Sequence, residues 1–550
     1  MTEYCTGGFR VLTVGLLLFL TVFSSCNNEY VSELPAEPED PDNYDMSVWE
    51  ELEPGIHSGF GSLDLAYPKS IPPSGDIEKS IKLYGWKGER VNCKLLAWSA
   101  EADEQISISF RELNNKAFRI ENEHISVSVI KYILTDEFLN ERSTSCGPRD
   151  KNKVPAHLQA DVLSQENVFM ADGPGTRPVW ISIDIPSDAI PGIYEGVVFR
   201  KSASGREKHP ITLEVQDKLL PHPSEWSFHL DLWQNPFAIA RYNGVELWSE
   251  EHLDLLKPLL KKLAGAGQKC ITATLIDKPW SGGPCFDPHG SMIDWTRKKD
   301  GSWEYDYTDF DNYVKLAMEC GIKEQINCYS MVPVTNEFTW YDEESSEFIV
   351  KEAVPGTGWY NNFWRGFLID FRAHLMEKGW LDITALALDE REEEEMRNLF
   401  SFLEETAPEF KIAMAGFYYE ALNQSIYDFS SNWRHTGILS DGVIDSRRNS
   451  GLKTTYYVAC GIPEPNSFTF SPPDESCYLG WFAVAEGFDG FLRWAYNSWP
   501  EKPLVDSRYT KWPAGDTYLI YRCALRPFAL ERMREGIQDY EKIKILREEL

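Results

Sequence analysis

Hydrophobic and polar residues alternate along much of the first 220 residues of the chain. This alternation is typical of β-strands that bury one face. The segments that alternate in this way, or that follow a Pro-Gly turn, are residues 106–110, 125–129, 179–185, 193–199 and 211–215. Several short strands separated by turn residues predict an all-β sandwich. We place this domain at residues 49–219.

The pattern changes after Leu220-Pro-His-Pro223, where short apolar runs alternate with longer amphipathic stretches. In the stretch 250–263, Leu253, Leu256 and Leu260 share one face, as in a helix. The short apolar runs are residues 228–233, 270–276, 324–329, 383–388, 411–415, 425–429, 454–459 and 490–496. Strands that alternate with helices predict a (β/α)8 barrel, here over residues 224–550, although 430–449 shows no clear helix. The fold class is therefore multidomain, an all-β sandwich followed by an α/β barrel.

The N-terminus carries a targeting signal. The apolar run Val11 to Phe23 is short for a membrane span and ends in Ser24-Ser25-Cys26. Small residues before a Cys are typical of a bacterial lipobox. We therefore predict a signal peptide over 1–25, lipidation of Cys26 and export to the outer membrane, with the lipid as the one membrane contact. A plain secretory signal is the alternative.

The residues after Cys26 are acidic and rich in Pro, and no Lys or Arg occurs between 27 and 44. Such a composition cannot bury apolar surface, so it predicts a disordered tether over 26–48. The whole chain has a formal net charge of -32, which argues against a nucleic-acid partner. The oligomeric state is left open.

The cysteines and histidines indicate neither a disulfide framework nor a metal centre. Eleven Cys are scattered without a CxxC pair, and no HExxH motif is present. Cys285 and His289 form the best candidate for a ligand pair, but a buried Cys and a loop His are far commoner. We predict no metal and no cofactor.

Two neighbouring carboxylates, Asp389-Glu390, follow the apolar run that ends at Leu388. In a barrel the carboxyl ends of all strands meet at one mouth, so these acids should lie there. Other side chains predicted at the same mouth are Trp233, Tyr457, Arg493, Trp494, Tyr496, Asn497 and Trp499. Sugars need this mixture of aromatic faces and polar partners. Structural roles are the alternative: Asp389 as a helix N-cap, and Trp494 and Trp499 as core residues.

Longer blocks make the resemblance specific. They are Leu388-Asp-Glu390, the run from Gly487 to Pro500, Trp512 to Tyr518, Leu530 to Tyr540, and Tyr84-Gly-Trp-Lys-Gly-Glu-Arg90. With these blocks the chain resembles glycoside hydrolase family 123, a family of β-N-acetylgalactosaminidases, from about residue 80 to the end.

The resemblance implies substrate-assisted hydrolysis with retention, in which the acetamido oxygen of the substrate attacks the anomeric carbon and forms an oxazoline. Asp389 would orient the acetamido N–H, and Glu390 would protonate the leaving oxygen and later deprotonate water. Tyr457 is the candidate to bond the acetamido carbonyl. The alternatives are a glycan-binding surface lipoprotein, a hydrolase of another β-hexosaminide, and a retaining hydrolase of a sugar without an acetamido group.

Overall fold

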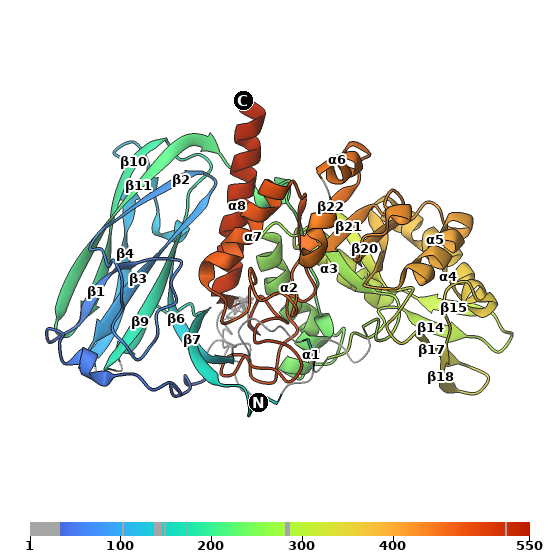
Figure 1. The fold of residues 1–550 in the computed structure, drawn as a ribbon, viewed down its shortest axis with the longest axis horizontal. Helices are drawn as coiled ribbons and strands as arrows, with labels where there is room; N and C mark the ends of the chain where they lie inside the picture. Colours follow the sequence, from blue (N-terminus) through green and yellow to red (C-terminus); the bar gives the residue numbers. More distant parts are fainter. Residues whose placement is uncertain are drawn as a thin grey trace, which may run out of the picture. The chain divides into compact units, whose positions relative to one another are not determined.

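The structure is a computed structural model that describes residues 34–101, 104–136, 146–147, 150–171, 173–280, 287–439, 441–522 and 525–550 (Figure 1). The predicted signal peptide and the lipidation site at Cys26 lie outside these residues, and so does Cys285. In the described ranges no helix has both the length and the apolar character that a membrane crossing requires.

Two six-stranded sheets form the N-terminal β-rich domain. The first sheet has the order β1 (His57–Gly61), β3 (Arg90–Ser99), β9 (Gly175–Asp184), β6 (Ile125–Asp136), β7 (Ala156–Leu163) and β24 (Arg526–Pro527). The second has the order β2 (Ile81–Lys87), β11 (Gly205–Leu219), β10 (Gly192–Ser202), β4 (Glu104–Asn114) and β5 (Arg119–Ile120), with β8 (Val168–Ala171) paired to β4. The alternating segments of the sequence therefore lie in strands, as predicted.

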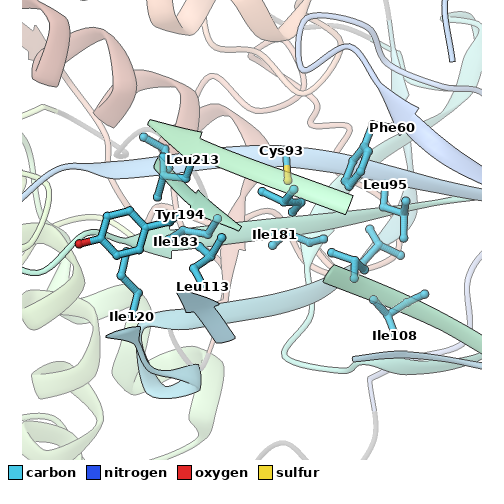
Figure 2. Close-up of a cluster of buried hydrophobic side chains, with 14 of the residues drawn as sticks. Phe60, Cys93, Leu95, Ile108, Leu113, Ile120, Ile181, Ile183, Tyr194 and Leu213 are labelled. Carbon is cyan, nitrogen blue, oxygen red and sulfur yellow. The ribbon is translucent and has the colours of Figure 1, made fainter. Parts of the chain in front are cut away.

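The two sheets share one hydrophobic core. Leu95 and Ile181 from the first sheet are buried together with Ile108 and Leu213 from the second. Figure 2 shows these side chains between the strands that carry them. Burial of such aliphatic side chains stabilises the domain by about 1.5–3 kcal/mol each. The predicted alternation arises here because every second residue of a strand points to this core.

The acidic stretch after the signal differs from the predicted tether. Glu37 forms ion pairs with Lys69 and Arg177, and the Ser70 hydroxyl donates to Asp40. Although burial opposes its charge, Arg177 and Lys69 hold the pKa of Glu37 at about 2. Trp49 is buried and donates to the Ser70 carbonyl. This part of 26–48 is thus held against the β-rich domain by charge pairs that composition cannot reveal.

The C-terminal domain contains an eight-stranded parallel barrel that is nearly closed. Its strands run in the order β12 (His229–Leu232), β23 (Gly490–Arg493), β22 (Lys453–Tyr457), β21 (Asp428–Asn432), β20 (Lys411–Gly416), β19 (Thr384–Leu388), β16 (Gln325–Tyr329) and β13 (Cys270–Thr274). An isolated parallel bridge joins Leu230 of β12 to Gln268, two residues before β13. Each predicted apolar run overlaps one of these strands, and β21 begins three residues later than the run at 425 suggested.

The helices surround the barrel unevenly. They are α1 (Pro236–Asn243), α2 (Glu250–Ala264), α3 (Thr308–Glu319), α4 (Gly358–Lys378), α5 (Glu393–Thr406), α6 (Asp441–Asn449), α7 (Pro473–Glu486) and α8 (Phe528–Glu549). Between β20 and β21 the chain forms only a short 3-10 turn, Glu420–Leu422. A strict alternation of strand and helix, as the (β/α)8 prediction requires, is therefore not complete, because the eleven residues between β20 and β21 are too few for a helix of ordinary length and its loops.

A four-stranded sheet that the sequence patterns did not indicate is inserted into the barrel domain. Its order is β15 (Trp303–Asp306), β14 (Asp294–Arg297), β17 (Glu337–Asp342) and β18 (Glu347–Glu352). The strands come from the connections that follow β13 and β16, and Trp295 of β14 packs on Phe363 and Phe367 of α4. Strands of four to six residues inside long connections leave too weak a periodicity to be predicted.

A disulfide joins the two domains, although the spacing of the cysteines indicated no disulfide framework. Cys146, from the connection between β6 and β7, is bonded to Cys460, three residues after β22. The two cysteines are separated by 314 residues, so no local spacing could indicate the pair. The same connection of the β-rich domain also contacts the long segment after β23, where Gly147 N–H donates to the Lys511 carbonyl at 3.0 Å.

Candidate active site

The acid pair lies at the carboxyl end of β19. All five residues of the strand are buried, whereas Asp389 is partly exposed and Glu390 is exposed. Helix α5 begins at Glu393 with Glu392 as its N-cap, so Asp389 does not cap it. The N-cap alternative is therefore wrong. The strand ends at the acids, and the turn allows two consecutive carboxylates to face one region.

Arg391 holds the backbone of the pair in place. Its Nε donates to the Val332 carbonyl at 2.8 Å, and its Nη1 donates to the Glu390 carbonyl at 2.5 Å. Nη1 also lies 3.9 Å from Oδ2 of Asp389. Burial raises the pKa of Asp389, and the charge of Glu390 adds to this, while Arg391 and the backbone N–H of Glu390 act in the opposite direction. The positive charge of Arg391 thus stabilises the ionised form of Asp389 beside a second acid.

Tyr457, at the end of β22, donates a hydrogen bond from its hydroxyl to Oε1 of Glu390. Burial and the charge of Glu390 raise the pKa of Tyr457, while Asn432 at the end of β21 lowers it. The hydroxyl therefore stays protonated and can only donate to the carboxylate. The structure thus places Tyr457 beside Glu390, and its bond to an acetamido carbonyl stays a prediction.

Gly416 makes room for this contact. The register of β19 and β20 pairs Leu388 with Met414, which brings Glu390 beside Gly416. A Cβ at Gly416 would lie 3.2 Å from Cα of Glu390 and 3.4 Å from its Cγ, and its φ of 153° also favours glycine. The space that a side chain would fill is available to the Glu390 side chain.

A cluster of aromatic rings lies inside the barrel, and Tyr457 belongs to it. Trp233 stacks on Trp280 with ring centroids 5.0 Å apart, and Tyr329 lies 4.6 Å from Trp233 and 4.9 Å from Trp280. Tyr457 and Trp494 contact the same apolar cluster. Burial is the main cause that raises the pKa of Tyr329, and the charges of Asp231 and Asp389 add to it. Aromatic faces beside carboxylates suit a sugar ring.

Most of the predicted side chains of strand eight lie in the interior instead. Arg493 is fully buried and forms an ion pair at 3.1 Å with the equally buried Asp516. Tyr496 donates to the Leu259 carbonyl, and Trp499 donates to the Ile520 carbonyl. The side chain of Asn497 accepts from Asn235 N–H and donates to the Asn235 carbonyl. These contacts hold loops together, as in the packing alternative for Trp499. A sugar-binding role for the four residues stays a prediction without support from their placement.

Trp494 differs from these neighbours because it is only partly buried. Its Nε1 lies 3.4 Å from Oδ1 of Asp516, and its ring is 5.1 Å from that of Trp512. Arg493 fixes Asp516, and Asp516 in turn orients Trp494. Arg493 is therefore linked to Trp494 only indirectly, through Asp516.

The base of the barrel contains a buried polar network that includes the one group of possible metal ligands in the described part of the chain: His229, Cys270 and Asp428. Nζ of Lys453 lies 3.0 Å from Nδ1 of His229, and an ammonium can only donate. His229 Nε2 must then carry a hydrogen, which it donates to Asp428 at 2.8 Å. Burial also raises the pKa of Cys270, which favours the thiol. With Nε2 and the thiol both protonated, these residues fit a hydrogen-bond network better than a metal.

Sequence reasoning missed Arg391, Gly416, Asn432, Tyr329 and Asp516. Arg391 directly follows the acid pair, so its position was an available signal. Three of the others are each the last residue of a barrel strand, where barrel sites are built. They are Tyr329 of β16, Gly416 of β20 and Asn432 of β21. Asp516 gave no such signal, because its contact with Arg493 depends on the path of a long loop.

Comparisons with known proteins agree with these observations. The model of the glycoside hydrolase 123 catalytic domain matches residues 233–546, and the model of the glycoside hydrolase 123 N-terminal domain matches residues 60–200. A solved family 123 glycoside hydrolase from Clostridium perfringens, studied for glycolipid glycan hydrolysis, is similar with 28% identity and a TM-score of 0.82, covering 90% of this chain and 89% of that chain. The search among curated proteins found no match.

Two further solved structures are far less similar. The maltogenic α-amylase AmyB from Thermotoga neapolitana has 11% identity and a TM-score of 0.32, covering 57% of this chain and 77% of that chain. β-Glucuronidase 3 from Bacteroides uniformis has 10% identity and a TM-score of 0.31, covering 82% of this chain and 50% of that chain. Similarity at this level carries no argument about the site.

Proposed function

Because this chain belongs to glycoside hydrolase family 123 and is therefore a glycosidase, we propose that it removes terminal β-linked N-acetylgalactosamine from glycans by substrate-assisted, retaining hydrolysis. The observation that carries the proposal is the different surroundings of two consecutive acids. Asp389 lies beside Arg391 and is only partly exposed, whereas Glu390 is exposed and bonded to Tyr457.

This arrangement supports a division of roles on one sugar ring. With the ring over Trp233 and Trp280, Asp389 would accept the hydrogen of the acetamido N–H and stabilise the positive charge that develops there. The acetamido oxygen forms a bond to the anomeric carbon while the glycosidic C–O bond breaks. Glu390 gives its proton to the leaving oxygen, a step that general acids accelerate by roughly 10²–10⁴-fold.

The second half of the reaction uses the same two acids. Water attacks the anomeric carbon, Glu390 takes the proton of that water, and the bond to the acetamido oxygen breaks so that the acetamido group is restored. No enzyme carboxylate needs to bond to the sugar. An ordinary retaining pair would need two carboxylates on opposite faces of the ring, about 5–5.5 Å apart. Neighbouring residues at one strand end suit the substrate-assisted route better.

The test is a comparison of aryl β-glycosides that differ at C2. An N-acetylgalactosaminide should be cleaved, and the galactoside, which lacks the internal nucleophile, should hardly react. A thiazoline analogue of the oxazoline should inhibit, because it resembles the intermediate. Equal cleavage of both glycosides, or a sugar trapped on Asp389 or Glu390, would contradict the mechanism. Preference for the glucosamine epimer would be compatible with the mechanism, but it would indicate another β-hexosaminide as the substrate.

We also propose that the protein is exported and anchored to the outer membrane through a lipid on Cys26. The motive is the Ser24-Ser25-Cys26 sequence that ends the apolar run. A lipid chain supplies membrane affinity without a spanning helix. Cys26→Ala should move the protein from the membrane fraction to the soluble fraction after cell lysis. Unchanged membrane association would contradict this anchor.

A further inference from the structure

Asn432, the last residue of β21, lies beside Tyr457, the last residue of β22. The two strands are parallel, and their register pairs Asn432 directly with Tyr457. Residues paired in this way present their side chains on the same face of a sheet. Asn432 therefore extends to the same side as the Tyr457 hydroxyl, which bonds to Glu390. The proposed mechanism does not use this amide.

The amide of Asn432 has a fixed orientation. Its Oδ1 accepts a hydrogen bond from Arg434 N–H at 3.0 Å and so caps the 3-10 helix Trp433–Ile438. An amide has one oxygen and one NH2 group, so Nδ2 is left for another partner. Burial and the charge of Glu390 raise the pKa of Tyr457, whereas a side-chain hydrogen bond with Asn432 lowers it. A hydrogen bond lowers the pKa of a phenol when the partner donates, so Nδ2 is the donor here.

The Tyr457 hydroxyl thus lies between a donor and an acceptor. It gives its one hydrogen to Oε1 of Glu390, and its oxygen accepts from Nδ2 of Asn432. A hydroxyl hydrogen can rotate about the C–O bond, so a donor on one side of the oxygen directs the hydrogen to the other side. The two bonds also strengthen each other, because hydrogen bonds in a chain polarise one another.

The turn that begins at Asn432 is held by packing and by a further hydrogen bond. The rings of Trp433 and Phe482, a residue of α7, have centroids 4.0 Å apart. The guanidinium of Arg434 donates to the carbonyl of Gly461, four residues after β22. The position of Asn432 is therefore set by neighbouring segments of the chain. A preorganised donor does not need to reorient during the reaction.

We propose that Asn432 is a positioning residue for the proton donor, because its Nδ2 directs the Tyr457 hydroxyl to Glu390. This inference rests on the proposed function, since it takes Glu390 as the proton donor. Asn432 acts on the acid through another side chain and need not touch the sugar. The alternative is that Asn432 only caps its 3-10 helix. The two roles use different atoms of one amide, Nδ2 and Oδ1, so substitutions can separate them.

The test uses variants that keep the cap and remove the donor. Asn432→Asp has nearly the same shape and a capping oxygen, and Asn432→Ser is a neutral capping residue that is too short to reach Tyr457. Both should lower kcat on a glycan with terminal β-linked N-acetylgalactosamine by about five- to tenfold, with KM within about twofold of wild type. Their thermal unfolding midpoints should match the wild type, which shows that the fold and the cap are kept.

A double-mutant cycle identifies the route of the effect. In Tyr457→Phe the oxygen that accepts from Asn432 is gone, so either substitution of Asn432 should then lower kcat by less than about twofold further. A full additional loss would overturn the proposal, because Asn432 would act independently of Tyr457. Wild-type kcat in both single variants would overturn it as well. A rise in KM as large as the fall in kcat would also do so, since Asn432 would then contact the sugar itself.

Asn398→Asp is the matched control for charge, because it adds the same charge at an exposed position of α5. It should leave kcat unchanged. An equal loss in Asn398→Asp, or a loss in Asn432→Asp without one in Asn432→Ser, would attribute the effect to charge and overturn the positioning role. Wild-type rates of Glu390→Gln on the same glycan would instead count against the proposed function. A strong loss in Glu390→Gln beside wild-type rates in both Asn432 variants would overturn the positioning role alone.

Discussion

The hydroxyl of Tyr457 donates a hydrogen bond to Oε1 of Glu390, although 67 positions separate the two residues in the sequence. Two strands, β20 and β21, lie between the strands that carry them. The bond is possible because β20 ends in Ala415 and Gly416, which leave the space above them open. It ties the exposed acid to the buried wall of the barrel and limits the directions in which its carboxyl group can point.

We therefore expect Tyr457→Phe to lower kcat by about 10- to 100-fold, since a misplaced proton donor loses much of the benefit of orientation. Steady-state kinetics on a glycan with terminal β-linked N-acetylgalactosamine is the measurement. Tyr456→Phe is the control, as that hydroxyl donates to the Leu479 carbonyl outside the site. Equal effects of both substitutions would indicate a structural role only.

Glu390→Gln should lower turnover of glycans by roughly 10²–10⁴-fold, because the amide cannot give up a proton. Glycosides with a nitrophenyl leaving group need less protonation, so their loss should be smaller. Binding of the thiazoline should be largely kept. The neighbouring Glu392→Gln is the control, and it should leave kcat unchanged because Glu392 serves as the N-cap residue of α5. Wild-type rates of Glu390→Gln on a natural glycan would refute its role as the acid.

Asp161 should make the stability of the protein depend on pH. It lies in β7, where it accepts from the Tyr521 hydroxyl and from Phe528 N–H of the C-terminal segment, with Tyr518 nearby. Burial raises its pKa from 3.8 to about 7, although Tyr521 and Phe528 act against this. The folded state thus holds a proton that the unfolded chain releases near pH 4. This contribution is full below about pH 4 and is lost as the pH rises to about 7.

Asp161→Asn removes this contribution. Thermal unfolding midpoints of the variant should therefore fall less than those of the wild type between pH 4 and pH 8. The wild type and the variant should be most alike at the acid end of the range. Parallel curves over the whole range would show that Asp161 does not titrate in this window.

Loss of the disulfide between Cys146 and Cys460 should destabilise the folded protein by about 2–4 kcal/mol, because the unfolded chain is no longer cross-linked. Cys146→Ser and reduction of the wild type should lower the unfolding midpoint by similar amounts, and reduction should not affect the variant further. Cys320→Ser is the control, since Cys320 is a free, partly buried thiol. If that change has an equal effect, or if reduction has none, the bond does not stabilise the protein in this way.

The order of the barrel strands and the position of the acid pair could both be predicted from the amino-acid sequence. Hydrophobic periodicity located the eight barrel strands and five strands of the β-rich domain, because the periods of 2 and 3.6 residues depend only on which side chains must be buried. The acid pair was predictable for a related reason: Asp389 and Glu390 follow a run that is buried along its whole length, and parallel strands bring their ends together. The blocks from Gly487 to Pro500 and from Leu530 to Tyr540 indicated the family.

The neighbours of the acids, in contrast, depend on how distant segments of the chain pack together. Arg493 and Asn497 are residue types that can bind sugars. Their partners Asp516 and Asn235 come from other loops, and both side chains are buried against them. The disulfide between Cys146 and Cys460 and the ion pair between Glu37 and Arg177 each join residues more than a hundred positions apart in the sequence. The direction of a side chain at a strand end depends on the segments that pack against it. The same is true of the partner of a buried charge, and no local sequence pattern specifies which segments these are.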